Sequence, residues 1–325
     1  MQICTFLLNM YNSAGCVRFC RYDSELYPYL VRDQNFICME NNSSKPRVFI
    51  DPTSNWGFKR LFGTPANSRL LKYLLNTIMD GPRITKVTLL DTNHPYVMSE
   101  NGSSTFDVYC ECDDRSEIIV EMQKCNEGNF EDRAFAYSAM AVMDQAKPKW
   151  DYRFNQVCFI GIATFNLFKT SSEYITTRRL CDKVGGKEYR NYLQIFIELP
   201  KFENDDFDLM SERDALLYLL KNLRSMDEMP QWVSRHGEEM RMLCDGSLYD
   251  KLSETEKESY DMSEEEELKW IRSVQYGREE GRLAGREEGA FQANLETAGK
   301  LKAEGLAIDV ISRCTGLSRD QVEAL

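Results

Sequence analysis

The sequence has no long hydrophobic run and very little histidine. No apolar stretch approaches the roughly 20 residues that a helix needs to cross a bilayer. The amino terminus has neither a basic region nor a long apolar core of the kind that directs secretion. Two histidines accompany eleven cysteines, and the four cysteines of the first 38 residues have neither a nearby histidine nor a compact zinc-type spacing. We therefore expect a soluble cytoplasmic protein with free thiols and no membrane partner.

The chain also lacks a basic excess. Its formal net charge is −12, and the acidic excess lies in residues 201–325, which hold 17 Lys/Arg and 29 Asp/Glu. The first 200 residues are balanced and can still bind a polyanion through a local basic patch. With 42% hydrophobic residues, the chain can bury one main core with extensions.

Composition and periodicity divide the chain into four predicted parts. The first is poorly ordered or is translated upstream sequence, since Met39 offers a second candidate start besides Met1. A folded core, a helical extension, and a glycine-spaced long helix with a helix-turn-helix-like end follow. The predicted boundaries are 1–47, 48–205, 206–262 and 263–325.

Helical and strand patterns are mixed in the predicted core, which indicates an α/β or α+β fold. A helix after Asn67 places five apolar residues on one face. A second helix is predicted at 130–145, and strands are predicted at 85–91, 105–112, 117–124, 156–165 and 192–199. Beyond residue 200 the pattern is helical and acidic, notably at 211–226 and 263–277.

Glycine recurs every fourth residue in the tail, at Gly277, Gly281, Gly285 and Gly289. Because the residues between are charged, we expect a solvated helix or one that binds a partner, with a homo-oligomer through this helix as one alternative. The last segment resembles a helix-turn-helix with Ser318 as a helix cap. The final helix carries only Arg319 as a base-reaching cation, so a plain helical terminus is favoured over DNA reading.

The segment FDVYCECDDRSEIIVEMQK places Asp107 on one predicted strand and Glu121 and Gln123 on the next. Alternate residues of a strand share a face, so Asp107 and Glu121 meet on one face only if the connecting loop has an odd length. A three-residue loop at 113–115 satisfies this, whereas a two-residue loop separates the acids.

These acids are either solvent-facing residues of a half-exposed hairpin or members of a buried site. The continuous apolar run Ile118–Val120 is typical of a strand covered on both faces, which makes an acid at its end unusual. Buried carboxylates need a compensating cation, and hard oxygen ligands suit a divalent metal. A metal-dependent hydrolytic site is the resulting hypothesis.

The chain resembles the Rpn family of recombination-promoting nucleases, the PD-(D/E)XK nuclease family transposases. The resemblance extends from about residue 48 to the carboxyl terminus. It rests on five segments in the expected order and on the glycine-spaced tail: DPTSNWGFKRLFGTPANSRLLKYLLN, FDVYCE, IIVEMQ, FEDRAFAYSAMAVMDQAKPKWDYRFNQVCFIGI and IFIELPKF.

The resemblance implies a restriction-endonuclease-like core, a central mixed sheet flanked by helices, here with an α-helical carboxyl-terminal extension. It implies that Asp107, Glu121 and the main-chain carbonyl of Met122 ligate Mg²⁺ and that Gln123 orients the attacking water. The implied activity is Mg²⁺-dependent hydrolysis of DNA phosphodiester bonds. Lys59, Arg60 and Arg133 become candidates for phosphate contacts, and surface exposure is the competing interpretation of Arg60.

Two departures weaken what the resemblance implies, and the second of them, Asn55, supports a rival interpretation. Gln123 carries no charge, and its neighbour Lys124 points to the other face. Asn55 stands where the family commonly has Asp, so support of the site at this position is weakened. The rival is a mobile-element remnant that binds DNA or itself with little or no cleavage, and a third alternative is a protein-interaction module built on the acidic tail. Tyr137 is expected either to face the site or to pack.

Overall fold

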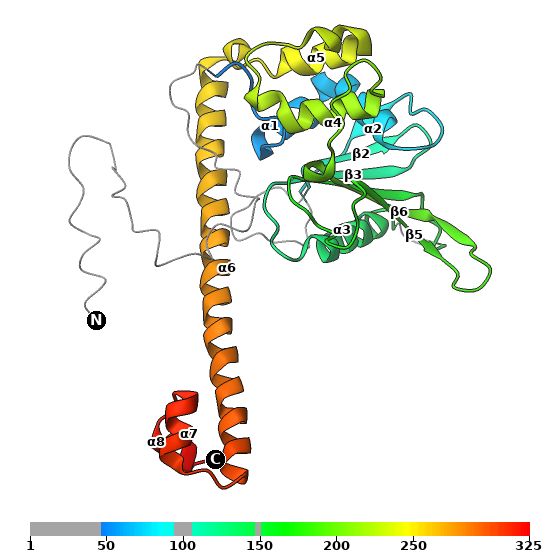
Figure 1. Cartoon of the computed structure of the whole chain (residues 1–325). Coiled ribbons are helices and arrows are strands. Elements are labelled where there is room, and N and C mark those ends of the chain that lie inside the picture. Colours follow the sequence, from blue (N-terminus) through cyan, green and yellow to red (C-terminus); the bar gives the residue numbers. More distant parts are fainter. Residues whose placement is uncertain (1–46, 94–105, 147–150) are drawn as a thin grey trace, which may run out of the picture. The chain divides into compact units, whose positions relative to one another are not determined.

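The computed structural model describes residues 47–93, 106–146 and 151–325, and within them a six-stranded mixed sheet forms the centre of the fold (Figure 1). The strand order is β1-β2-β3-β4-β6-β5. Neighbouring strands β3, β4 and β6 are parallel, and the other pairings are antiparallel. The strands are β1 (Val87–Leu89), β2 (Val108–Cys112), β3 (Glu117–Gln123), β4 (Val157–Ala163), β5 (Ile175–Cys181) and β6 (Glu188–Glu198).

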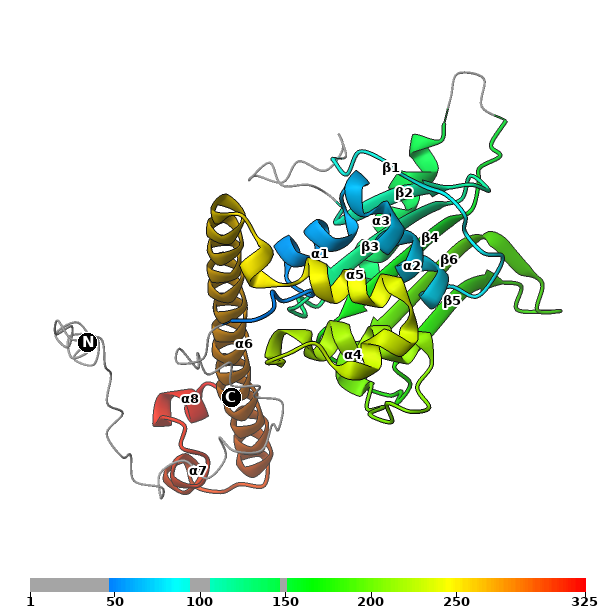
Figure 2. The ribbon, with the colours of Figure 1, turned by 90° about the horizontal axis from the view of Figure 1, so that it is seen from above.

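Helices cover both faces of the sheet (Figure 2). One face packs against four helices in the larger apolar cluster: α1 (Asn55–Phe62), α2 (Ser68–Ile78), α4 (Glu212–Asn222) and α5 (Glu238–Gly246). The other face packs against α3 (Phe130–Asp144). The predicted central mixed sheet flanked by helices, as expected of a restriction-endonuclease-like core, is confirmed.

The two central strands are buried because they are apolar on both faces. Every residue of β4 is buried, and Ile118–Val120 of β3 is fully covered, as the sequence predicted. Gly161 of β4 provides room for the aromatic ring of Phe130 on α3. This close approach sets the position of the helix that carries Arg133.

Helix α1 begins at an Asp-Pro-Thr-Ser segment. The Ser54 side chain caps it by accepting the Gly57 N–H at 3.0 Å. Gly57 lies so close to the Asp51 carbonyl that an added Cβ would be 2.1 Å from its oxygen. Phe58 and Phe62, four residues apart on one face of α1, are buried in the core.

Strand β5 was not predicted. It is the edge strand of the sheet, and its sequence ITTRRLC has one half-buried face and no buried residue. An exposed edge strand with two arginines has little of the apolar signal by which strands are predicted.

The carboxyl-terminal region contains one long helix and two short ones: α6 (Glu254–Ala303), α7 (Ile308–Thr315) and α8 (Arg319–Glu323). The predicted cap Ser318 forms a capping box with Gln321. The end of α6 packs with α7 and α8 in a small apolar cluster, while the glycines of the tail face open space. Arg319 pairs with Asp309 at 2.9 Å within this cluster.

Several predicted boundaries can be placed on the structure. The predicted segment 1–47, with both candidate starts, lies outside the described residues except for Arg47. The helices α4 and α5 of the predicted extension pack on the main apolar cluster, and the boundary between 262 and 263 lies inside α6. In the part of the chain that the structure describes, none of the helices is long and apolar enough to cross a membrane.

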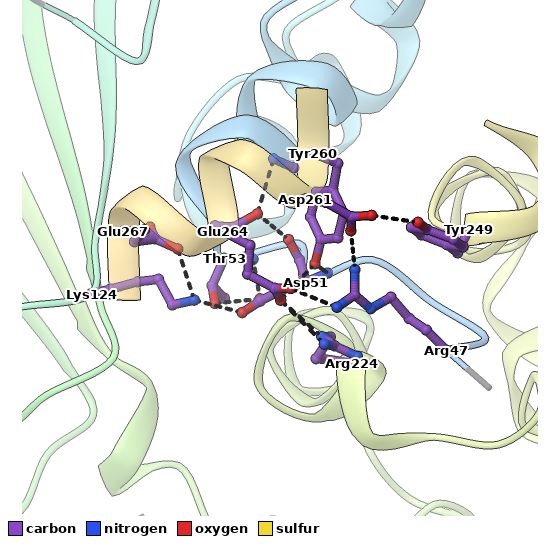
Figure 3. A network of polar contacts seen from close by, with 12 residues as sticks. Arg47, Asp51, Thr53, Lys124, Arg224, Tyr249, Tyr260, Asp261, Glu264 and Glu267 are labelled. Carbon is purple, nitrogen blue, oxygen red and sulfur yellow. Dashed lines mark hydrogen bonds and ion pairs between the residues drawn. The ribbon is translucent and has the colours of Figure 1, made fainter. Parts of the chain in front are cut away.

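A buried polar network joins the beginning of α6 to the core (Figure 3). The Lys124 ammonium lies 2.7 Å from Asp51 Oδ2 and 3.1 Å from Glu267 Oε2, and all three side chains are mostly buried. Burial alone would raise the pKa of Asp51, but Lys124 and hydrogen bonds from Thr53 lower it. Lys124 follows β3 directly, so these ion pairs fix the end of that strand.

The same network continues along α6. The Tyr260 hydroxyl accepts the Asp51 N–H at 2.9 Å and donates to Glu264 at 3.1 Å. The Glu264 carboxylate also forms ion pairs with Arg47 and Arg224. The first part of α6 is therefore held to the core by buried, multiply bonded charges rather than by isolated surface pairs.

Gly161→Ala should destabilise the protein by about 1–3 kcal/mol because a Cβ there would lie 2.7 Å from the Phe130 ring and would force overpacking. Gly277→Ala, in the exposed middle of α6, should instead be neutral or stabilising by up to ~1 kcal/mol. Urea unfolding at equilibrium measures both. Equal free energies of unfolding for the two variants would contradict the close packing of β4 against α3.

Lys124→Met should cost about 3–5 kcal/mol of the free energy of unfolding, because it leaves two buried carboxylates without their cation. The control is Lys300→Met, which removes an exposed ion pair between Lys300 and Glu296, both on α6. This control should cost less than ~1 kcal/mol. Thermal and urea unfolding compare the two. A cost for Lys124→Met no larger than that of the control would show that the network contributes little.

Candidate active site

The turn between β2 and β3 has the predicted odd length. Residues 113–115 form a three-residue loop, closed by a hydrogen bond from the Cys112 N–H to the Ser116 carbonyl at 2.9 Å. Arg115 takes a left-handed conformation with φ of 66°. The register pairs Val108 with Val120, which extends to Asp107 opposite Glu121. The prediction that the two acids share one face is confirmed.

The two acids are joined through the backbone. The Asp107 N–H donates to Glu121 Oε1 at 3.0 Å, and the Met122 N–H donates to Asp107 Oδ2 at 2.9 Å. Glu121 is 4% exposed, and the Asp107 side chain is 13% exposed. One oxygen of each carboxylate thus accepts a hydrogen bond from a main-chain N–H.

Burial shifts the protonation of both acids in the same direction. It raises the pKa of Glu121 well above its ordinary value, and the adjacent negative charge of Asp107 raises it further. Burial also raises the pKa of Asp107, although the attraction of Lys59 opposes the shift. Two buried carboxylates side by side are under-compensated by the protein, which is typical of a site built to receive a cation.

Two cations approach the acids from opposite helical layers. Lys59 of α1 places Nζ 3.4 Å from Asp107 Oδ1. Arg133 of α3 acts on both acids, since its charge lowers the pKa of each. Its Nη1 lies 3.4 Å from Glu127, whereas Nε and Nη2 are buried and have no hydrogen-bond partner among the described residues. A buried guanidinium edge without acceptors is suited to bind an anion.

Tyr137 both packs and borders the site. Its ring contacts Phe106 with a centroid distance of 5.0 Å, next to Asp107 in the chain. Burial, with a smaller contribution from the charge of Glu121, raises the pKa of Tyr137 to about 12. The hydroxyl therefore stays protonated at neutral pH and can act as a hydrogen-bond donor beside the carboxylates.

Gln123 ends β3 on the face that Glu121 occupies, and its main-chain carbonyl accepts the Thr164 N–H at 3.0 Å. The ammonium of Lys124 lies in the network with Asp51 and Glu267, on the other face as predicted. Lys124 therefore has a structural role, pairing with Asp51 and Glu267, and does not supply the positive charge that Gln123 lacks.

The structure does not bring Arg60 and Asn55 to the carboxylates. Arg60 donates to the Gly246 carbonyl at 2.7 Å and pairs with Glu256 at 3.1 Å, between α1, α5 and α6. Successive helical residues point about 100° apart, so Lys59 faces the acids and Arg60 does not. Asn55 is exposed, and its N–H donates to Glu267 at 3.3 Å.

Asp51, which holds Lys124 and with it the end of β3, was not predicted from the sequence. The local signal for it is the Asp-Pro-Thr-Ser segment, whose Asp accepts two hydrogen bonds from Thr53 at the start of a helix. Its ion pair with Lys124 links residues 73 positions apart and has no periodic signature.

The oxygen donors fit a divalent cation of the hard type. No group of three or more His, Cys, Asp or Glu residues able to hold a metal occurs within residues 47–93, 106–146 and 151–325. Among the described residues the available set is instead two carboxylates, each with one oxygen that accepts no main-chain hydrogen bond, and the main-chain carbonyl of Met122, one residue before the end of β3. Such mixed carboxylate, carbonyl and water coordination is usual for Mg²⁺.

Comparison with protein families finds one model, described as PD-(D/E)XK nuclease family transposase, which matches residues 52–277. Searches of the curated proteins and of the solved structures gave no significant match. The matched region contains all six strands and Lys59, Asp107, Glu121, Gln123 and Arg133. Since the match covers more than half of the 325 residues, the chain belongs to the PD-(D/E)XK nuclease family transposases.

Proposed function

We propose that this protein is a Mg²⁺-dependent endonuclease that hydrolyses DNA phosphodiester bonds, of the recombination-promoting, transposase-associated type. The observation that carries the proposal is the pairing of Asp107 and Glu121 on one face of the β2–β3 hairpin, both buried and both with a raised pKa. The family of nucleases to which the chain belongs supports DNA as the substrate class.

Asp107, Glu121 and the main-chain carbonyl of Met122 would hold the metal ion. When bound, Mg²⁺ would lower the pKa of a coordinated water molecule and stabilise negative charge on the phosphate. Because the raised pKa of Glu121 favours its neutral form, binding of the cation is coupled to loss of a proton from this pair. Burial strengthens the electrostatic interactions within the site.

The remaining residues have distinct roles in this proposal. Gln123 orients the attacking water through its amide and, being uncharged, does not stabilise a hydroxide electrostatically. Lys59, 3.4 Å from Asp107, is the cation that compensates for the missing charge. Arg133 binds the phosphate through Nε and Nη2, the donors that have no acceptor among the described residues. Tyr137 donates a hydrogen bond beside Glu121.

Three further predictions accompany this function. The protein acts in the cytoplasm, it has no membrane partner, and it self-associates through the glycine-spaced part of α6, where the glycines face open space. The rival function is a DNA-binding or self-associating remnant with weak or no cleavage. The nicking experiment below distinguishes the rival from the nuclease, because a remnant would nick DNA weakly or not at all.

Asp107→Asn and Glu121→Gln should each reduce nicking of supercoiled plasmid in Mg²⁺ by at least ~100-fold, because each removes a carboxylate on which charge stabilisation depends. Glu111→Gln is the matched control, since Glu111 is an exposed acid of the same strand β2. Its nicking rate should equal that of the wild type. Nicking that is equal in all four proteins, or absent from all four, would remove the catalytic assignment.

Glu121→Gln should stabilise the metal-free protein by ~0.5–2 kcal/mol at neutral pH. The reason is that the substitution removes a buried carboxylate whose charge is unfavourable beside Asp107. The folded state holds the Glu121 proton more tightly than the unfolded chain does. Wild-type stability therefore falls as pH rises from the ordinary carboxyl pKa through the raised one, and the advantage of Glu121→Gln grows over that window.

Thermal unfolding with and without Mg²⁺ completes this measurement. Mg²⁺ at ten times its dissociation constant should stabilise the wild type by about 1.4 kcal/mol and leave Glu121→Gln nearly unchanged. A less stable Glu121→Gln protein, or equal stabilisation of both proteins by Mg²⁺, would contradict a metal site at these acids.

A further inference from the structure

Strands β5 and β6 continue beyond the sheet as a two-stranded arm, residues 180–190. Residues 192–198 of β6 pair with β4, whereas among the described residues the strands of the arm pair with each other, through Leu180 with Tyr189 and Cys181 with Glu188. At its base the arm also contacts the segment before β4, through the rings of Phe154 and Tyr189 and a hydrogen bond from Gln156 to the Arg190 carbonyl at 2.6 Å. The register shifts at Arg179/Leu180, where the arm begins. The tip turns through Gly185 and Gly186, which have φ of 88° and 64°.

The arm has no buried face. Every residue from 180 to 190 is exposed, including Val184 at 89% and Leu180 and Tyr189 at 49% each. A two-stranded hairpin without an apolar face gains little stability from water-excluding contacts. Packing against the core therefore does not account for the extension of the arm.

The charge of the arm differs from that of the chain. Residues 178–190 contain five Lys/Arg and two Asp/Glu, in a protein with a formal net charge of −12. At its base, Arg178 pairs with Glu131 and Arg179 with Glu188. Lys183, Lys187 and Arg190 form no ion pair within the described residues. Three unpaired cations on an exposed ribbon fit a polyanion.

Protection of the sheet edge is the competing explanation, because lysine on an edge strand prevents pairing between molecules. Within the arm both strands are edges, so edge protection accounts equally well for Arg190 on β6. Lys183 and Lys187 lie at the tip, outside both strands, and edge protection does not require cations there.

The register of the sheet gives the separation between the arm and the carboxylates. Glu121 pairs with Gly161, and Gly161 pairs with Phe196, so Phe196 is level with the candidate active site. Lys187 precedes Phe196 by nine residues along the strand direction, which corresponds to roughly 30 Å. One turn of B-DNA is roughly 34 Å. A two-stranded ribbon also has the dimensions of the major groove.

We propose that the β5–β6 arm binds duplex DNA about one helical turn from the bond that is cut, with Lys183, Lys187 and Arg190 contacting phosphates. The proposal rests on the proposed function in that DNA is the ligand, but it does not require cleavage. It assigns to this protein an exosite that determines how long a duplex must be for tight binding.

The test measures binding of fluorescein-labelled duplexes of 10 and 24 base pairs by anisotropy in EDTA, over a series of salt concentrations. The variant carries Lys183→Gln, Lys187→Gln and Arg190→Gln. The control carries Lys86→Gln, Lys251→Gln and Lys300→Gln, three exposed lysines away from the arm. Plasmid nicking in Mg²⁺ is measured on the same proteins.

The arm variant should bind the 24-base-pair duplex at least tenfold more weakly, with a salt slope lower by about 3. Its affinity for the 10-base-pair duplex, which cannot reach both sites, should change less than threefold. The single variant Lys187→Gln should lower the slope by about 1. Equal losses for both duplexes, or arm and control variants that match, would overturn the proposal.

The nicking measurement separates this proposal from the proposed function. A wild type that nicks plasmid while the arm variant retains full affinity for the long duplex would overturn the arm and leave the nuclease intact. A wild type that binds neither duplex would overturn the arm whatever its nicking activity. Tight, arm-dependent binding without nicking would support the arm and contradict the nuclease.

Discussion

The register of the β2–β3 hairpin is the constraint on which the candidate site depends. A slip of one residue would exchange Glu121 for an apolar neighbour on the site face and separate the two acids. The three-residue loop sets this register, and the acids themselves reinforce it. Asp107 lies just before β2, where regular ladder bonds end, and the side chains of Asp107 and Glu121 accept the main-chain donors there. The groups that would bind metal therefore also complete the sheet.

The position of the cations depends on a second constraint, the ion pair between Asp51 and Lys124. Asp51 precedes the helix that carries Lys59, and Lys124 follows the strand that carries Glu121. Their contact at 2.7 Å holds the two segments in fixed relation. Glu267 adds α6 to the same contact, so this part of α6 belongs structurally to the folded core. The family match, which ends at residue 277 within α6, agrees with this division.

The sequence predicted the features that depend on local periodicity. Apolar spacing predicted α2 and α3, the run Ile118–Val120 predicted a strand covered on both faces, and parity predicted the loop length. It did not predict β5, because an edge strand with one half-buried face has no strong alternation. The different orientations of Lys59 and Arg60 depend on the packing of α1, which neighbouring positions in the chain do not reveal. The contact between Lys124 and Glu267 spans 143 residues and has no local signal.

The acidic excess of the carboxyl-terminal region has a structural explanation in these contacts. The first turns of α6 use their acids against cations of the core: Glu256 pairs with Arg60, Glu264 with Arg47 and Arg224, and Glu267 with Lys124. The cations on this side of the core are thereby neutralised within the protein. Lys59 and Arg133 remain beside the carboxylates, and the arm keeps three cations that form no ion pair within the described part of the chain. A protein that is acidic in total can thus present positive charge where a phosphate backbone would approach, because four acids at the start of α6 are paired with other cations of the core.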